Sequence, residues 1–321
     1  MILGTGRATP ERVLTNADLE KIVDTTDEWI RERTGIERRF IAADHETNSQ
    51  FAARAAQRAL QSANISAEQI DIIVQGTVTG DVGFPANACY VQELIGATNA
   101  AAFDISAACS GFIYGLALAD GFIASGKARY VLVIGCELLS RITDWKDRAT
   151  CVLFGDGAGA CVIGPSEGER GLIDTFIKSD GRLTELLCMK GRGTSIPLEV
   201  ALAERKVFLA MQGREVFKYA VTAMGDASAH ILEKNGMTSD DIDLFIPHQA
   251  NLRIITATAK RLNVSMDKVY VNVQDYGNTS AASIPIAIDE AIEKKRLQSG
   301  NRCLMVAFGG GFTWGSALVQ L

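Results

Sequence analysis

The sequence predicts an α/β protein made of two similar halves, each with a mostly parallel sheet covered by helices. Three observations support this fold class. The chain has 321 residues, 47% of them hydrophobic, so it can bury a large core and is too long for one ordinary compact domain. Helix-like segments alternate with short apolar runs of strand length, such as residues 130–134 and 243–246. The 30 glycines, against 6 prolines, favour tight turns rather than disorder.

Two pairs of segments repeat along the chain at nearly the same separation. Residues 126–135 and 300–309 share a turn, a polar stretch, an apolar run and a final glycine, and 300 − 126 = 174. Residues 70–74 and 242–246 each follow a helix-like segment and a polar loop, and 242 − 70 = 172. The common offset indicates an internal duplication, with chance similarity between two generic helix–loop–strand units as the alternative. We therefore predict an N-terminal half, residues 1–164, and a C-terminal half, residues 165–321.

Charge and cysteine usage restrict the partners and the cellular setting. A net charge of −6 without a block of like charges lacks the attraction that drives nucleic-acid binding, so we expect no nucleic-acid partner. The 7 cysteines show no paired spacing and no secretory signal precedes them, which favours reduced thiols and a cytoplasmic protein. No apolar run approaches the roughly 20 residues of a membrane-spanning helix, so we expect a soluble protein without membrane association.

Cys109 is the candidate nucleophile. It follows a strand-like segment and precedes a small, apolar stretch, residues 112–124, that suits a buried helix. A cysteine at a helix N-terminus lies close to free N–H groups and partial positive charge, which stabilise a thiolate. The alternative for any cysteine is a small buried apolar residue. We interpret the other six in that way: Cys89, Cys136, Cys151, Cys161, Cys188 and Cys303.

His248 is the candidate catalytic histidine. It follows the apolar run 244–246 and Pro247, which places it at the end of a strand, where an α/β sheet opens its ligand crevice. A loop histidine without a catalytic role is the alternative. The other two histidines are poorer candidates, since His45 lies in a polar stretch and His230 falls within a helical pattern.

Three turn-like segments contain polar or glycine residues that a site can use. Asn278 lies between the β-rich run 269–273 and a helix, where helix capping is the default explanation. Residues 307–312 hold three glycines between two strand-like runs, which suits N–H donors for an oxyanion or a tight hairpin. Residues 154–159 resemble a phosphate-binding loop only superficially, and we predict a hairpin turn there.

Together, these motifs resemble those of β-ketoacyl-acyl-carrier-protein synthase III. The motifs are Ala-Ala-Cys109-Ser-Gly, Pro-His248-Gln-Ala-Asn and Gly-Asn278-Thr-Ser-Ala-Ala-Ser, in that order. The similarity extends over essentially the whole chain, from an N-terminal Gly-Thr-Gly to a C-terminal Gly-Gly-Gly-Phe-Thr-Trp-Gly-Ser. The resemblance implies a thiolase-like fold, a duplicated five-layer αβαβα structure, which agrees with the repeat found above.

The resemblance also implies an acyltransferase that starts fatty acid synthesis. Cys109 would take an acyl group from an acyl-CoA, most often acetyl-CoA, and malonyl-acyl carrier protein would lose CO₂ and attack it. His248 and Asn278 would stabilise the enolate, and the backbone N–H groups of Cys109 and Gly310 would hold the tetrahedral oxyanion. The family uses no metal or redox cofactor.

Binding sites follow from the same resemblance, with a solvated surface residue as the alternative for each position. Trp29 and Arg148 would sandwich the adenine ring of CoA, with Thr25 and Arg33 at its polar end. Basic positions would dock the acidic acyl carrier protein: Lys218, Arg253 and Lys260. Phe84 would close the acyl pocket from across a homodimer interface.

Other functions stay open at this point. Within the superfamily, the main alternative is a ketosynthase for longer acyl-CoA or secondary-metabolite primers, whereas a degradative thiolase would need a second cysteine near the C-terminal glycines. Outside it, Cys, His and Asn also serve cysteine hydrolases, which release a free acid rather than form a carbon–carbon bond. A non-catalytic binding protein would leave Cys109 unreactive.

Overall fold

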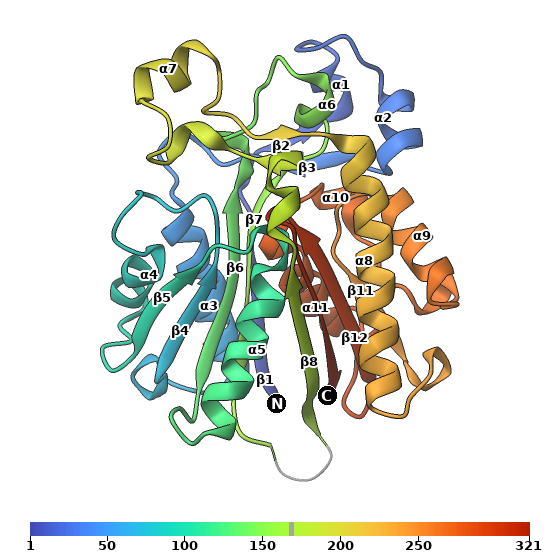
Figure 1. Ribbon diagram of the computed structural model, residues 1–321. Helices are drawn as coiled ribbons and strands as arrows, with labels where there is room; N and C mark the ends of the chain where they lie inside the picture. The colour runs from blue at the N-terminus through green and yellow to red at the C-terminus, as the bar shows by residue number, and fades with distance from the viewer. Residues whose placement is uncertain (167–169) are drawn as a thin grey trace.

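Two β-sheets with helices between and outside them make up the structure, a computed structural model that describes residues 1–166 and 170–321 (Figure 1). The first sheet has the order β1 (Ile2–Ala8), β7 (Asp156–Ile163), β6 (Val131–Leu138), β4 (Ile72–Gly76) and β5 (Ala101–Ile105). The second has the order β8 (Gly171–Ser179), β13 (Thr313–Gln320), β12 (Arg302–Gly309) and β11 (Leu244–Pro247).

The second sheet repeats the order and the strand directions of the first. From β1 to β4 the neighbours pair antiparallel, antiparallel and parallel, and from β8 to β11 they pair in the same sequence. A parallel bridge between Phe245 and Val269 even takes the place that β5 has beside β4. The internal duplication predicted from the two repeated segments is therefore present in the fold. We propose residues 1–164 and 165–321 as its two halves, since β7 ends at Ile163 and β8 begins at Gly171.

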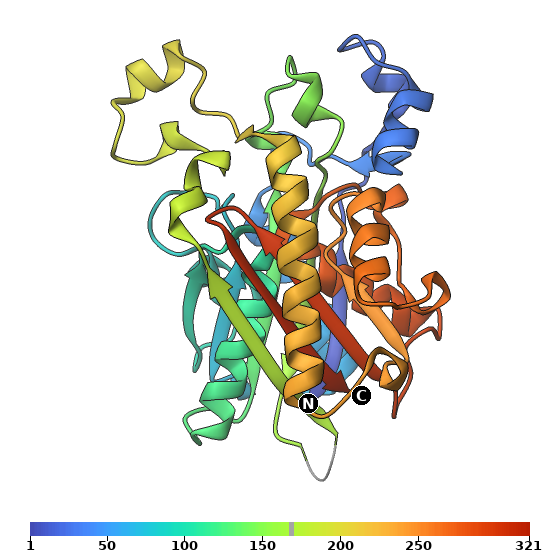
Figure 2. The same cartoon turned by 45° about the vertical axis from the view of Figure 1, so that its right-hand side comes forward.

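Five layers result from where the helices pack. Helices α5 (Gly111–Ala124) and α11 (Ser283–Glu293) lie between the two sheets and share one hydrophobic core with them. Helices α3 (Asn48–Ala63) and α4 (Asn87–Ile95) cover the outer face of the first sheet. Helices α8 (Gly213–Lys234) and α9 (Leu252–Arg261) cover the outer face of the second, and Figure 2 shows α8 crossing that face. The αβαβα arrangement expected from the resemblance is confirmed.

Alternation along β6 explains why both faces of the first sheet are covered. Val131 and Val133 pack into the central layer, whereas Leu132 and Ile134 pack against the outer helices. A strand that is apolar on both faces is stable only when helices bury both. For the same reason, these strands appear in the sequence as continuous apolar runs and not as alternating apolar and polar residues.

The smaller elements gather beyond one end of the two sheets, at the top of Figure 1. They comprise β2 (Val13–Thr15), α1 (Asn16–Leu19), α2 (Asp27–Thr34), β3 (Arg38–Phe40), α6 (Arg148–Cys151), β9 (Leu187–Cys188), α7 (Leu198–Ala203), β10 (Ala210–Met211) and α10 (Val273–Tyr276). In residues 1–166 and 170–321, no helix has the length and apolar character needed to cross a membrane.

The strand predicted for residues 269–273 is wrong. After the single bridge at Val269 the chain turns, and Val273 already begins α10. The side chain of Gln249 accepts hydrogen bonds from the N–H groups of Asn272 and Val273, at 3.0 and 3.2 Å. A glutamine side chain therefore satisfies the donors that a neighbouring strand would have satisfied.

The hairpin turn predicted for residues 154–159 is also wrong. Strand β7 already begins at Asp156 and pairs with β6 on one side and β1 on the other. The glycines serve packing instead, since a Cβ at Gly159 would lie 2.6 Å from the backbone nitrogen of Ile286. Because these glycines have no side chain, α11 can lie directly on the sheet.

Candidate active site

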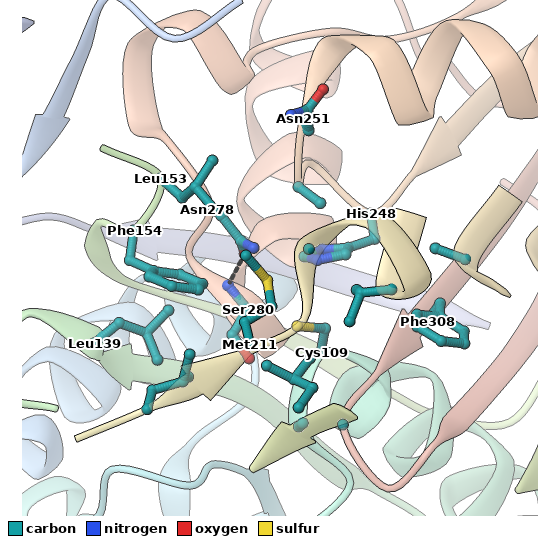
Figure 3. A pocket seen from close by; sticks show the side chains of 18 of the residues that line it. Cys109, Leu139, Leu153, Phe154, Met211, His248, Asn251, Asn278, Ser280 and Phe308 are labelled. Carbon is teal, nitrogen blue, oxygen red and sulfur yellow. Dashed lines mark hydrogen bonds between the residues drawn. The ribbon is translucent and has the colours of Figure 1, made fainter. Parts of the chain in front are cut away.

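A cavity of about 700 Å³ lies at the end of the sheets where the smaller elements gather. Cys109, His248 and Asn278 all line it, and Figure 3 shows their side chains around the same space. Cys109 and His248 follow strands β5 and β11, as the sequence predicts, whereas Asn278 follows helix α10 and not the predicted strand. The structure therefore brings the three candidate residues together in one cavity.

Cys109 lies on a short 3₁₀ helix, η2 (Ala108–Ser110), between β5 and α5. Ala108 has a φ of 45°, a left-handed conformation that a residue with a side chain rarely adopts. The turn is held against β13, because the Ser110 hydroxyl donates to the Thr313 carbonyl at 3.0 Å and the Thr313 hydroxyl donates to the Ala107 carbonyl at 2.8 Å. These bonds maintain a strained turn that presents the thiol to the cavity.

The pKa of Cys109 does not follow the expectation of a stabilised thiolate. Burial raises it to about 12, hydrogen bonding with Ser280 acts in the opposite direction, and the nearby Glu137 carboxylate raises it further. Cys109 is therefore a thiol at neutral pH, and its proton must leave as it attacks a substrate.

His248 follows β11 and is 2% exposed. Burial lowers its pKa to about 3, so the ring is neutral at pH 7. Its Nδ1 lies 2.6 Å from the Ser283 hydroxyl, which also accepts the N–H of Gln249 at 3.3 Å. The Ser283 hydroxyl keeps its hydrogen for Nδ1 while it accepts from Gln249, and with this bond donated by Ser283 the ring proton is on Nε2. His248 is then a hydrogen-bond donor toward the cavity.

Asn278 is oriented in a comparable way. Its Oδ1 accepts the backbone N–H of Ser280 at 2.8 Å, the bond drawn in Figure 3. Its backbone is held on both sides by the segment before β7, through bonds of 2.8 Å to the Leu153 carbonyl and 3.0 Å from the Gly155 N–H. With Oδ1 occupied, the side-chain NH₂ is the group left for the cavity. Two N–H donors, from His248 and Asn278, therefore accompany the thiol.

The glycine turn between β12 and β13 packs directly on the nucleophile. A Cβ at Gly309 would lie 2.6 Å from the backbone nitrogen of Cys109, so glycine is required for this approach. Gly310 follows and lines the cavity. The segment is both a tight hairpin and a wall of the site, so the two alternatives from the sequence describe the same turn.

Trp29 and Arg33 line the outer part of the cavity, on α2. The guanidinium groups of Arg33 and Arg148 each lie 4.8 Å from the centre of the Trp29 ring. Arg148 also donates to the Asp24 carbonyl at 2.9 Å, and the Thr25 hydroxyl is buried without a hydrogen-bond partner. The predicted pair of Trp29 and Arg148 is thus adjacent, and an adenine ring between them requires Arg148 to swing away.

Lys218, Arg253 and Lys260 are exposed on α8 and α9. The two helices pack against each other, and each also contributes residues to the cavity wall, such as Phe217 and Ile254. The three basic residues therefore lie on the two helices that also contribute to the cavity wall.

Phe84 does not line the cavity of its own chain. It is 89% exposed on the loop between β4 and α4. A cluster of apolar side chains of the same chain lines part of the cavity instead: Leu139, Ile142, Phe154, Met189 and Leu209. Sequence reasoning did not identify these residues, because they come from loops without a periodic pattern.

Three polar residues of the site were also missed. Ser280 and Ser283 belong to a motif that was recognised, yet their contacts with Asn278 and His248 depend on the folded turn. Glu137 lies in an apolar strand and carries no sequence signal. Within residues 1–166 and 170–321, no group of three or more His, Cys, Asp or Glu side chains is arranged to hold a metal ion.

Comparisons with known proteins agree with this geometry. The family model described as 3-oxoacyl-[acyl-carrier-protein (ACP)] synthase III matches residues 103–181, and the model for its C terminal matches residues 232–321. The chain is 52% identical to the β-ketoacyl-[acyl-carrier-protein] synthase III of Caldanaerobacter subterraneus, over 99% of this chain and 97% of that protein. It is also 52% identical to the corresponding protein of Thiobacillus denitrificans, over 99% and 98%.

Solved structures give the same result in three dimensions. The 3-oxoacyl-[acyl-carrier-protein] synthase III of Aquifex aeolicus superposes with a TM-score of 0.93 at 51% identity, over 100% of this chain and 99% of that one. The β-ketoacyl-[acyl carrier protein] synthase III of Thermus thermophilus superposes with a TM-score of 0.92 at 44% identity, over 100% of this chain and 98% of that one. The chain therefore belongs to the 3-oxoacyl-[acyl-carrier-protein] synthase III family.

Proposed function

We propose that this enzyme joins the acyl group of an acyl-CoA, with acetyl-CoA as the primer, to malonyl-acyl carrier protein. The products are β-ketoacyl-acyl carrier protein, CoA and CO₂, and the reaction starts fatty acid synthesis. One observation carries the proposal: a cysteine thiol and two N–H donors, on His248 and Asn278, line a single cavity that extends to Trp29. This set of groups suits acyl transfer followed by stabilisation of an enolate.

The first half of the reaction loads the enzyme. The Cys109 sulfur attacks the thioester carbon of acyl-CoA, the bond from that carbon to the CoA sulfur breaks, and CoA leaves with a proton as a free thiol. The acyl group is then held on Cys109 as a thioester. We propose that the backbone N–H groups of Cys109 and Gly310 hold the tetrahedral oxyanion, which is supported by the packing of the glycine turn on the Cys109 backbone.

The second half forms the new carbon–carbon bond. Loss of CO₂ from malonyl-acyl carrier protein leaves an enolate whose oxygen accepts from His248 Nε2 and Asn278 Nδ2. The enolate carbon attacks the acyl carbon, and the bond to Cys109 breaks. The sulfur then takes up one proton from solvent, which balances the proton that CoA carried away. A neutral His248 suits this role, since the donor needs no proton transfer of its own.

Substrate binding is assigned to the cavity mouth. We propose that Trp29 and Arg148 hold the adenine of CoA, with Thr25 and Arg33 at its polar end, because Trp29 and Arg33 line the cavity that leads to Cys109. Exposed basic side chains on α8 and α9, which also contribute to the cavity wall, would orient the acidic carrier protein: Lys218, Arg253 and Lys260. The reaction as written needs no metal or redox cofactor.

We also propose that the protein forms a homodimer and is cytoplasmic. A homodimer would explain the exposed apolar side chains that include Val82, Phe84 and Leu118, with Phe84 entering the partner's acyl pocket. All seven cysteines, which lie in the described part of the chain, are free thiols, and this supports a cytoplasmic setting.

The alternatives from the sequence are less favoured. A priming ketosynthase of the R1128 polyketide pathway is 37% identical to this chain, against 52% for relatives named β-ketoacyl-[acyl-carrier-protein] synthase III. A hydrolase needs an activated water. Here the neutral His248, with its pKa lowered to about 3, is a weak base for that purpose.

Intact-mass spectrometry tests the proposal directly. Acetyl-CoA should add one acetyl group to the wild type and none to Cys109→Ala. Malonyl-acyl carrier protein should then remove that group and yield acetoacetyl-acyl carrier protein with CO₂. Labelling by longer acyl-CoA alone would favour the other ketosynthases, release of acetate would favour a hydrolase, and an unlabelled Cys109 would contradict catalysis.

A further inference from the structure

Arg39 is a fully buried arginine beside the wall of the active-site cavity. It lies on β3 and is 0% exposed. Its Nη2 donates to the Val152 carbonyl at 2.8 Å, and its Nη1 donates to the Leu14 carbonyl at 3.3 Å and to Asn16 Oδ1 at 2.9 Å. Burial lowers its pKa to about 10, so the guanidinium is still charged at pH 7. A buried cation with these three uncharged acceptors is costly, which indicates a role for its rigid set of donors.

One of these contacts leads directly to Asn278. Residues 152–155, of which the first three line the cavity, are called the wall segment below. The Asn278 N–H donates to the Leu153 carbonyl at 2.8 Å, and the Asn278 carbonyl accepts the Gly155 N–H at 3.0 Å. The wall segment therefore holds the backbone of Asn278 on both sides, and Arg39 holds the wall segment.

The stem of the Arg39 side chain packs on the same junction. Phe154 of the wall segment and Asn278 form a parallel bridge. Gly155 follows one partner of this bridge and Gly277 precedes the other. A Cβ at Gly155 would lie 3.0 Å from the Arg39 Cβ, and a Cβ at Gly277 would lie 3.3 Å from it. Arg39 is thus adjacent to both partners of the bridge that fixes Asn278.

Strand β3 is also fixed to α10, the helix that leads into Asn278. The Arg38 guanidinium lies 2.7 Å from an Asp275 carboxylate oxygen. The rings of Phe40 and Tyr276 have their centres 5.5 Å apart. These contacts hold the strand in place independently of Arg39, so the guanidinium can be removed without releasing the strand.

Another acceptor connects Arg39 with the mouth of the cavity. Asn16 begins α1, is 1% exposed and donates through Nδ2 to Asp27 Oδ1 at 2.8 Å. Asp27 begins α2, the helix that carries Trp29. A guanidinium presents its donors in a rigid planar fork, so a single side chain can hold two segments at a fixed distance. Arg39 therefore lies where the wall segment meets the helix at the cavity mouth.

We propose that Arg39 is a positioning residue for the condensation step, because its guanidinium holds the wall segment and thereby sets the place of Asn278 in the cavity. This inference rests on the proposed function. Asn278 Nδ2 has to lie at the enolate oxygen, and a displacement of about 1 Å from such a position costs roughly 100-fold in rate. Loading of Cys109 does not use Asn278, so only the second half-reaction depends on Arg39.

Arg39→Met tests the positioning role. Methionine keeps an unbranched apolar stem on the two glycines and removes the donors. At saturating acetyl-CoA, acylation of Cys109 should stay within about threefold of the wild type. The single-turnover reaction of the acetylated enzyme with malonyl-acyl carrier protein should slow roughly 10-fold, as a displacement well below 1 Å predicts. Arg39→Lys keeps a cation but donates from one nitrogen, so it should show the same selective loss, and it serves if Arg39→Met fails to fold.

A double variant and a matched control make the test specific. In an Asn278→Ala background, Arg39→Met should not slow condensation further, because the side chain that it positions is absent. Gln75→Met is the control, since Gln75 is likewise 0% exposed and joins distant segments, through Asn48 of α3 at 2.7 Å and Asn87 of α4 at 3.2 Å. Both half-reactions of this variant should stay within about threefold of the wild type.

The outcomes separate the positioning role from the proposed function. Wild-type condensation in either Arg39 variant would overturn the role. Equal losses in both half-reactions, additive losses with Asn278→Ala, or the same selective loss in Gln75→Met would also overturn it, since each indicates general damage. If the wild type takes no acyl group from acetyl-CoA, or if Asn278→Ala condenses at the wild-type rate, the proposed function fails instead.

Discussion

The Ser283 hydroxyl lies 2.6 Å from His248 Nδ1. In the first half of the duplicated chain, Gly111 corresponds to Ser283 and Gly76 corresponds to His248. The correspondence follows from the repeat, since 283 − 111 = 172 and 248 − 76 = 172. In the first half a Cβ at Gly76 would lie 2.9 Å from the Gly111 Cα, so the two backbones touch. One half therefore uses this position for close packing and the other for chemistry, which explains how a duplicated fold carries a single active site.

Removing the Ser283 hydroxyl should impair only the second half-reaction. Ser283→Ala removes the hydroxyl that holds the His248 ring in the tautomer that donates through Nε2. We expect a loss of about 1 kcal/mol, which is roughly fivefold in rate. Single-turnover measurement with malonyl-acyl carrier protein should show this loss, and Cys109 acylation should be unchanged. Ser283→Thr keeps a hydroxyl and should restore most of the rate. Equal loss in both steps would contradict the role given to Ser283.

His248 should also make stability depend on pH. Its pKa is lowered to about 3 in the folded state by burial, against about 6.5 when unfolded, so the unfolded chain binds a proton that the folded chain does not. This contribution to stability is complete above pH 6.5 and falls as the pH drops toward 3. At pH 5 the loss is about 2 kcal/mol.

Urea denaturation of the wild type and His248→Asn at pH 7 and pH 5 measures this effect. The variant should lose about 2 kcal/mol less than the wild type between the two pH values. Glu137, whose pKa is raised by burial, changes stability in the opposite direction below pH 7, but it is present in both chains and cancels in the comparison. The same pH dependence in both chains would show that His248 is not a buried neutral imidazole.

The repeated segments, the apolar strands and the three residues that share the cavity could all be predicted from the sequence. Strands buried on both faces read as apolar runs, and a polar residue directly after such a run, as at His248, lies at the edge where sites form. Residues 269–273 misled this reasoning, because a β-branched run looks the same whether a strand or the Gln249 side chain satisfies its N–H groups.

Other properties of the site depend on contacts that no local pattern reveals. The raised pKa of Cys109 results from burial where the two halves meet, whereas the sequence shows only the helix N-terminus that follows it. Glu137 is one acidic residue in an apolar strand, and its partner Ser280 is 143 residues away. Long-range pairing of this kind is decided by the fold, not by neighbours in the chain.

The glycine turn on the nucleophile should tolerate no side chain. In Gly309→Ala the new Cβ would lie 2.6 Å from the Cys109 nitrogen, so the turn or the nucleophile must shift. We expect roughly 100-fold loss of acylation, because a displacement near 1 Å is enough for that, and destabilisation of about 1–3 kcal/mol. Gly181→Ala is the control, since its Cβ would meet nothing within 4 Å. Wild-type labelling of Gly309→Ala by acetyl-CoA would show that the turn does not position Cys109.

Arg148 should matter for acyl-CoA and not for the carrier protein. Its guanidinium lies 4.8 Å from the Trp29 ring centre, and we propose that the two hold an adenine, a group that phosphopantetheine on a carrier protein lacks. Arg148→Ala should raise the KM for acetyl-CoA about fivefold, since such contacts contribute about 1 kcal/mol, and leave the KM for malonyl-acyl carrier protein unchanged. Arg54→Ala removes a similar stacking contact, 4.1 Å from the Phe51 ring on α3, and should change neither. If both KM values rise together in Arg148→Ala, the residue serves the shared entrance rather than the adenine.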